Sequence, residues 1–276
     1  MVVRAVRNVA RGTARTPART PARAAVGAAV AGLLTLAVTG CGLLTTDTAS
    51  PGATAAATSA APSAPSAAAG DVPVKADPAA LAALPARLEA DGTTITVGDP
   101  AAPKTVHIYE DPRCPICKAF EAAAGPQLAA LAKAGDIKVQ YTLASFLDDN
   151  LKGSGSKKAA GALRASVEAG TGAFATYHEL LYANQPEERV DGFTDDHLLK
   201  LAGQVKGLRG AAFDTAVRKQ SYADFVAASE EAFVKSGATG TPYVKIDGEP
   251  VSQADLQKLF DPVSFAALLR QSGIGG

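Results

Sequence analysis

The chain has 276 residues, of which 27 are basic and 27 are acidic, so its formal net charge is zero. Six arginines and no acidic residue fall within residues 1–40, and the rest of the chain is therefore net acidic. A net-acidic domain lacks the basic face that nucleic-acid binding requires, so we expect no nucleic-acid partner. Three cysteines are too few for a multi-disulfide scaffold.

Residues 1–40 have the pattern of a signal peptide. An arginine-rich start leads into the apolar stretch 24–38, which is shorter than the ~20 residues of a membrane-spanning helix. The small residues before Cys41 resemble a bacterial lipobox, in which cleavage makes the cysteine the lipid-bearing N-terminus. We therefore predict a lipoprotein anchored to the bacterial cell membrane through Cys41. A secreted protein and an uncleaved anchor are the alternatives, and all three place the following chain outside the cytoplasm.

Residues 41–76 are predicted to be a disordered tether. Positions 48–70 contain only Ala, Ser, Thr, Pro and Gly, which cannot bury enough apolar surface to offset the entropy of ordering. The folded domain is predicted to span residues 77–276, where all the Phe and Tyr residues lie. A domain of this length can form a core without disulfides.

The first part of the domain has the pattern of a β-α-β unit behind a short helix. The predicted elements are, in chain order, a helix at 79–89, strands at 93–97 and 104–109, a helix that ends before Gly135, and a strand at 137–143. Pro85 disfavours the end of the first helix.

The rest of the domain is helical and then returns to strands. The predicted elements are helices at 157–169, 173–183, 194–205 and 210–235, the last broken near Ser221, then a strand at 243–246, a turn at Asp247-Gly248, a return strand from Pro250 and a helix at 260–269. The fold class is therefore α/β, with a helical insertion over about 154–236.

Cys114 and Cys117 are the candidate catalytic residues. They stand three positions apart at a helix start, so they share one face at a separation that a disulfide can bridge. Pro115 suits the first helical position. The free N–H groups of the helix start lower the pKa of Cys114, and the positive charge of Arg113 is expected to lower it further. Cys117, one turn further in, is less exposed. Cys114 is thus the predicted attacking thiol, and Cys117 resolves the mixed disulfide.

Three other interpretations of this pair stay open. It could be a structural disulfide, although so short a loop stabilises little, or a pair of inert buried thiols. A zinc half-site would need further ligands, and His107, His178 and His197 have no ligand spacing. We therefore predict no metal site. The cysteine pair is itself the redox centre, so no bound cofactor is predicted.

Three segments together resemble the DsbA-like branch of the thioredoxin superfamily. They are DPRCPICKAFE at 111–121, YHELLYANQ at 177–185 and GTPYV at 240–244. The resemblance implies a thioredoxin-like fold with an inserted helical subdomain, and activity as a thiol–disulfide oxidoreductase on exported proteins. It also implies that Thr241-Pro242 is a cis peptide facing the sulfurs, where Thr241 would receive a substrate segment as an added strand. A trans proline at a strand start is the alternative.

The chain departs from the DsbA-like pattern at Ile108 and Ile116, and its insertion lacks the tryptophan that is frequent in the family. Many relatives carry an acid six residues before the first cysteine, and here that position is Ile108, which puts the proton-transfer route in question. Ile116 stands where the strongest oxidases carry a histidine that stabilises the thiolate. Pro115 and Ile116 are therefore expected to tune the pair to a less oxidising potential.

The resemblance also implies a membrane partner for the pair. An oxidase would pass electrons to a membrane protein, of which the vitamin K epoxide reductase-like type is the candidate. A reductase would need electrons delivered across the membrane, and the sequence does not give the direction. The second hypothesis is a non-catalytic chaperone or adaptor lipoprotein that reuses the fold, against which the intact cysteine pair argues.

Overall fold

A computed structural model describes residues 75–275. The predictions made for the signal peptide, for Cys41 and for the tether up to residue 74 lie outside the described residues. Ala76, placed in the tether by composition, is buried and packs in the core of the domain. Within residues 75–275 no helix combines the length and the apolar character needed to cross a bilayer.

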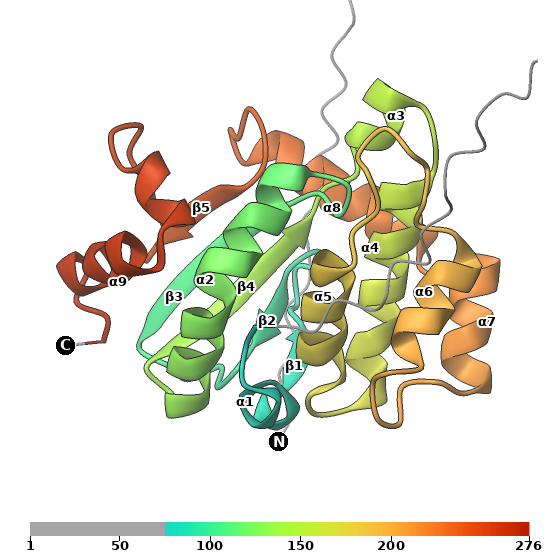
Figure 1. Ribbon diagram of the computed structural model, residues 1–276, viewed down its shortest axis with the longest axis horizontal. Helices are drawn as coiled ribbons and strands as arrows, with labels where there is room; N and C mark the ends of the chain where they lie inside the picture. The colour runs from blue at the N-terminus through green and yellow to red at the C-terminus, as the bar shows by residue number, and fades with distance from the viewer. Residues whose placement is uncertain (1–74, 276) are drawn as a thin grey trace, which may run out of the picture. The chain divides into compact units, whose positions relative to one another are not determined.

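A single mixed sheet organises the described part of the chain (Figure 1). Its strands, in the spatial order β1-β2-β4-β3-β5-β6, are β1 (Ala86–Leu88), β2 (Ile95–Val97), β4 (Ile137–Leu143), β3 (Lys104–Glu110), β5 (Tyr243–Ile246) and β6 (Glu249–Pro250). The central strands β3 and β4 pair in parallel, and every other pair is antiparallel. The parallel pair is joined by a helical crossover, as such a pair requires.

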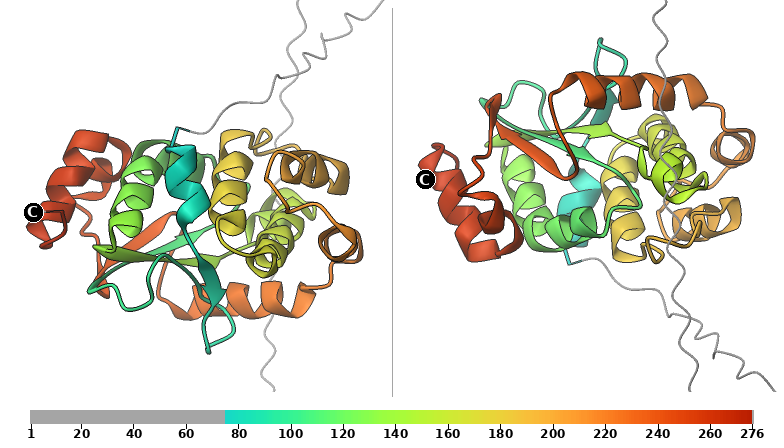
Figure 2. Two further views of the ribbon diagram at one scale, coloured as in Figure 1. Left: turned by 90° about the horizontal axis from the view of Figure 1, so that it is seen from below. Right: turned by 90° about the horizontal axis from the view of Figure 1, so that it is seen from above.

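The helices pack against this sheet and against one another. They are α1 (Pro78–Ala83), α2 (Pro115–Ala134), α3 (Leu147–Leu151), α4 (Gly155–Ser166), α5 (Ala173–Ala183), α6 (Asp195–Ala202), α7 (Ala211–Lys219), α8 (Ala223–Lys235) and α9 (Pro262–Gln271), with short 3₁₀ helices η1 (Val167–Ala169) and η2 (Leu256–Phe260). Figure 2 shows α1, α2 and α5 on one face of the sheet and α8 on the opposite face. The helices α4 to α8 separate β4 from β5 along the chain, which confirms the predicted helical insertion.

The core lies between the sheet and α2. Val106 and Ile108 of β3 pack with Val139 of β4 and with Phe120 and Leu128 of α2, and all five side chains are buried. The apolar residues that recur along α2 at three- and four-residue spacing therefore face the sheet, as the helical period predicts. This packing fixes the start of α2 at the carboxyl end of β3.

One local prediction was wrong, and one short helix was missed. Residues 86–88 form the edge strand β1 instead of the end of a helix, because Pro85 forces Leu84 into an extended backbone and ends α1 at Ala83. The chain then pairs with β2. The short helix α3 was not predicted at all, since five residues are too few to show a helical period.

Candidate active site

Cys114 and Cys117 lie where the sequence placed them, at the start of α2. Cys114 is the N-cap residue, Pro115 is the first helical residue, and Cys117 lies one turn further in. The side chain of Cys114 is 7% exposed and that of Cys117 is 0% exposed, whereas Ile116 between them is 51% exposed. The two cysteines are separate thiols. The predicted difference in exposure is thus confirmed, and only Cys114 can be approached from solvent.

The environment of Cys114 favours its thiolate. A hydrogen bond from Cys117 lowers the pKa of Cys114 most, and Thr241 and the backbone N–H groups of Cys117 and Ile116 lower it further, to about 6 from an ordinary 9.0. These N–H groups are the unpaired donors of the first helical turn, as predicted. Burial, the nearby Cys114 sulfur and Glu110 raise the pKa of Cys117 well above its usual range. The two thiols are therefore opposite in character.

Thr241 lies beside the sulfur of Cys114, and Pro242 follows it in the chain. The loop before β5 carries them, and the antiparallel register of β5 with β3 brings that loop next to the start of α2. The Thr241–Pro242 peptide bond is cis, in agreement with the expectation from the resemblance. The Thr241 carbonyl oxygen accepts a hydrogen bond of 3.4 Å from the Sγ of Cys114.

Arg113 points into the protein and forms a buried ion pair. Its guanidinium lies 2.8 Å from the carboxylate of Asp148 in α3, and it also donates to the carbonyl of Glu188 at 2.8 Å. Both side chains of the ion pair are at most 2% exposed. The groups that set the pKa of Cys114 come from Cys117, Thr241 and the helix start. The electrostatic effect predicted for Arg113 on Cys114 therefore stays a prediction, while its contacts join the active-site loop to the inserted helices.

Asp111 and Gln185 also hold the active-site loop. The carboxylate of Asp111 accepts hydrogen bonds from the backbone of Arg113 at 2.9 Å and from the hydroxyl of Ser156 at 2.5 Å. The side-chain amide of Gln185 donates to the carbonyls of Pro112 at 2.8 Å and of Cys114 at 2.9 Å. Sequence analysis gave neither residue a role. The only signal was their presence in two of the three segments that carry the family resemblance.

Glu110 is a buried carboxylate whose charge acts on the thiol of Cys117. Ile108 points into the hydrophobic core, so the position at which many relatives carry an acid holds none. Glu110, the last residue of β3, is 0% exposed, and its charge contributes to the raised pKa of Cys117. Burial raises the pKa of Glu110 itself well above the usual range. An acid thus lies beside the thiols, but it comes from a different position along the strand.

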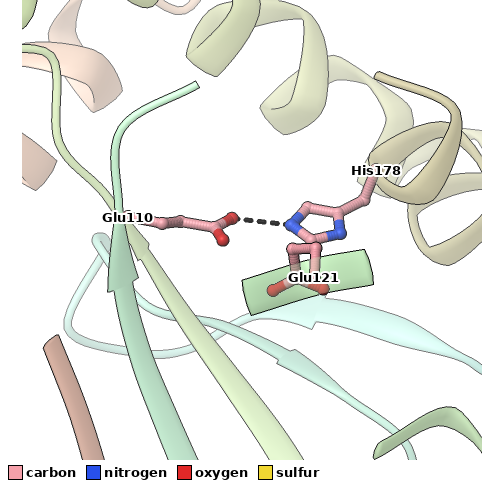
Figure 3. A group of neighbouring side chains, drawn as sticks. All are labelled: Glu110, Glu121 and His178. Carbon is pink, nitrogen blue, oxygen red and sulfur yellow. Dashed lines mark hydrogen bonds and ion pairs between the residues drawn. The ribbon is translucent and has the colours of Figure 1, made fainter. Parts of the chain in front are cut away.

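Glu110 belongs to a buried polar cluster on three elements (Figure 3). His178 of α5 lies 2.6 Å from Glu110, measured from its Nε2 to the carboxylate, and Glu121 of α2 lies beside both. The three side chains are at most 2% exposed. Sequence analysis assigned none of them to a site. The signals in the sequence were the spacing of four residues between Cys117 and Glu121, which places both on the same face of α2, and the presence of Glu121 and His178 in two of the segments that carry the family resemblance.

Comparisons with known proteins agree with this fold. A sequence model described as thioredoxin matches residues 90–262, more than half of the chain. The solved structure of BdbD from Bacillus subtilis superimposes with a TM-score of 0.56 at 21% identity, covering 69% of this chain and 97% of that one. The MdbA thiol-disulfide oxidoreductase of Corynebacterium diphtheriae gives 0.54 at 22% identity, covering 69% and 93%.

The class of protein follows from these observations: an α/β protein with a thioredoxin-like fold, inserted helices and a cysteine pair at a helix start. The chain belongs to the thioredoxin family. Among curated proteins, disulfide bond formation protein D of Bacillus subtilis is 24% identical over 169 residues, which are 60% of this chain and 74% of that protein. The predicted fold class is thereby confirmed.

Proposed function

We propose that this protein is a thiol–disulfide oxidoreductase that exchanges disulfides with exported proteins through the pair Cys114 and Cys117. One observation carries the proposal: an acidic and slightly exposed thiol lies one helical turn before a buried thiol of raised pKa. An acidic, accessible thiol is largely thiolate near neutral pH and can attack a substrate disulfide. A second thiol one turn behind it can then attack the mixed disulfide and release the reduced substrate. The names of the similar proteins, which describe disulfide formation and thiol–disulfide exchange, support the same function.

The exchange balances without a cofactor. A substrate thiolate attacks the Sγ of Cys114 in the Cys114–Cys117 disulfide, which joins the substrate to Cys114 and releases Cys117. A second substrate thiolate then attacks the substrate sulfur of this mixed disulfide, so the substrate gains a disulfide and Cys114 leaves as the thiolate. Two electrons pass from the substrate to the protein. The reverse sequence, in which Cys114 attacks and Cys117 resolves, reduces a substrate disulfide.

The substrate is proposed to lie along Thr241 and Pro242. Because the Thr241 carbonyl is 3.4 Å from the attacking sulfur, an extended segment that follows this backbone would bring its own sulfur next to Cys114. Backbone pairing of this kind binds segments of differing sequence. Such tolerance suits an enzyme that acts on many exported proteins.

The site of action is proposed to be outside the cytoplasm, at the membrane. The sequence pattern of residues 1–40 and the small residues before Cys41 support export and lipid attachment. Disulfide exchange is most useful in that compartment, because exported proteins retain their disulfides there. A membrane protein of the vitamin K epoxide reductase-like type is the proposed electron acceptor if the protein acts as an oxidase.

The test is the oxidation of a reduced test protein that regains its activity only with its disulfides. The oxidised protein should restore this activity, and Cys114→Ser should abolish the effect. Gln253→Ala, on the exposed turn before η2, serves as the control that keeps full exchange. If the unmodified pair transfers no disulfide in either direction, the proposal is wrong. A preserved ability of the Cys114→Ser variant to bind unfolded chains would then favour the non-catalytic adaptor.

A further inference from the structure

We propose that Glu110, Glu121 and His178 form a binding site for a divalent first-row transition-metal cation of the zinc type, behind the cysteine pair. No property of the proposed redox function is needed for this inference. The sequence predicts no metal site, because these residues have no ligand spacing along the chain. The fold brings them together from β3, α2 and α5.

The ligand atoms already lie near the positions that one ion needs. One carboxylate oxygen of Glu110, one of Glu121 and one ring nitrogen of His178 all lie within 4.8 Å of one another. Zinc bonds of about 2.0–2.2 Å place ligand atoms up to about 4 Å apart. Side-chain shifts of less than about 1 Å would therefore bring the three groups around one ion. Figure 3 shows the three side chains gathered in one place.

Unpartnered oxygens point to a missing ligand. Both carboxylate oxygens of Glu121 and the Oε2 of Glu110 are buried without a hydrogen-bond partner within the described residues. Glu121 is 1% exposed and Glu110 is 0% exposed. Leaving buried carboxylate oxygens unpaired costs several times more than a typical hydrogen bond contributes. A bound cation would coordinate these oxygens and remove that cost.

The local charge points the same way. A third buried carboxylate, that of Glu179 in α5, lies close enough to raise the pKa of Glu121. Within residues 75–275 none of these three glutamates forms an ion pair with a lysine or arginine, and the imidazole of His178 is the only basic partner. Buried charges in proteins are paired or coordinate metals. A divalent cation would balance two of the three carboxylates, and a mixed set of imidazole and carboxylate ligands suits zinc.

The surroundings of Glu121 are close-packed on one side and open to a cavity on the other. A side chain at position 125 of α2 would collide with the carboxylate of Glu179 and come within 3.2 Å of that of Glu121, so Gly125 is what lets the Glu179 carboxylate pack against α2 beside Glu121. A cavity of about 200 Å³ is lined by Glu121, Glu179 and Tyr182 together with Lys75 and Lys118. One of the three ligand residues, Glu121, thus borders a cavity that neither cysteine lines.

The test uses a full chain in which all three cysteines are serine, C41S/C114S/C117S, so that no thiol can bind the metal. The chain is loaded with Zn²⁺, freed of excess, and its metal content is measured by native mass spectrometry. We expect one Zn²⁺ per chain. Glu121→Gln and His178→Asn should each lower the affinity by about 100-fold or more, since even outer-shell changes cost 10–100-fold. Glu249→Gln, an exposed glutamate in β6, should leave the affinity unchanged.

A second measurement covers variants that fail to fold. Because a ligand that binds only the native state stabilises it, the thermal midpoint of the cysteine-free chain should rise with added Zn²⁺. Co²⁺ should give visible absorption that His178→Asn changes. The proposal is overturned if the cysteine-free chain binds no Zn²⁺ and its midpoint does not move, which would mean that the carboxyls hold protons instead. Binding that survives both ligand substitutions overturns it as well. Since this chain cannot exchange disulfides, neither result depends on the redox function.

Discussion

The Thr241 carbonyl oxygen lies 3.4 Å from the Cys114 sulfur, although 127 positions separate the two residues in the chain. The insertion of α4 to α8 accounts for most of this separation. The pairing of β5 with β3 then returns the loop that carries Thr241 to the start of α2. A long insertion is tolerated because the entropy of closing a loop grows slowly with its length. The two halves of the site are thus assembled by strand pairing.

The first prediction concerns the pH dependence of Cys114. Its pKa is lowered to about 6, so its thiolate is the main form above that pH and is lost as the pH falls below it. The rate of alkylation of Cys114 should therefore rise with pH, with a midpoint near pH 6. It should be nearly constant above about pH 7.5, where almost all of the thiol is ionised. The measurement is the alkylation rate against pH, with Cys114→Ser as the blank. A midpoint near the ordinary value of 9.0 would contradict the site description.

Ile116 is the position at which the potential can be changed most cleanly. Its side chain is 51% exposed, so a substitution leaves the core intact. Ile116→His adds a donor that stabilises the Cys114 thiolate, and hence the reduced state. The reduction potential measured in a glutathione buffer should rise by about 30 mV or more, which is tenfold in the equilibrium constant. Ile116→Leu, which adds no donor, should leave it unchanged.

The unchanged protein provides the reference for that shift. Because isoleucine offers no hydrogen bond to the thiolate, its potential should lie below the ~−120 mV of the strongest oxidants, toward the ~−270 mV of thioredoxin. A value as high as that of the strongest oxidants would show that groups other than Ile116 set the potential.

The ion pair of Arg113 with Asp148 should be the electrostatic contact most sensitive to substitution in the active-site loop. Asp148→Asn leaves the buried guanidinium with only the half-exposed Asp191 at 4.0 Å as a charged partner, and should lower the free energy of unfolding by about 3 kcal/mol. The neighbouring Asp149 pairs with Lys157 at the surface, and Asp149→Asn should cost less than about 1 kcal/mol. Urea unfolding of the two variants measures the difference. Equal effects would mean that the buried pair contributes no more than a surface one.

Gly125 offers a test of the close packing around the glutamates. A methyl group on Gly125, in α2, would collide with the carboxylate of Glu179 from α5. Gly125→Ala should therefore lower the free energy of unfolding by about 1–3 kcal/mol. Gly161 in α4 has no neighbour nearer than 3.8 Å, and Gly161→Ala should stabilise by up to about 1 kcal/mol through helix propensity. Opposite signs in thermal or urea unfolding would support the packing, whereas stabilisation by both changes would contradict it.

Much of the fold could be predicted because the spacing of apolar residues and the positions of glycine, proline and other turn residues indicate the same element boundaries. The strand at 137–143 and the helix at 173–183 match β4 and α5 residue for residue, and the break predicted near Ser221 separates α7 from α8. The turn at Asp247-Gly248 has both residues at positive φ, as a tight hairpin requires. The edge strand β1 was missed because its three residues depend on pairing with β2, which no local pattern records.

In the candidate site, too, residues that are close in the chain could be predicted and contacts between distant residues could not. Cys114, Pro115 and Cys117 are neighbours in the chain, so their chemistry follows from spacing at a helix start. The buried pair of Arg113 with Asp148 joins residues 35 positions apart, and Glu110 meets His178 across 68 positions. Contacts of this kind arise only when the sheet and the inserted helices pack. A sequence analysed alone identifies the thiols but not the charges that surround them.

The most direct test of the central claim is the capture of a mixed disulfide. In Cys117→Ser the resolving thiol is absent, so a test protein with an accessible disulfide should become joined covalently to the variant and be released by a reducing agent. Peptide mapping should find the bond at Cys114. The account predicts this adduct with Cys117→Ser and none with Cys114→Ser. If Cys117→Ser forms no adduct, or forms it equally well without Cys114, then Cys114 is not the thiol that exchanges disulfides.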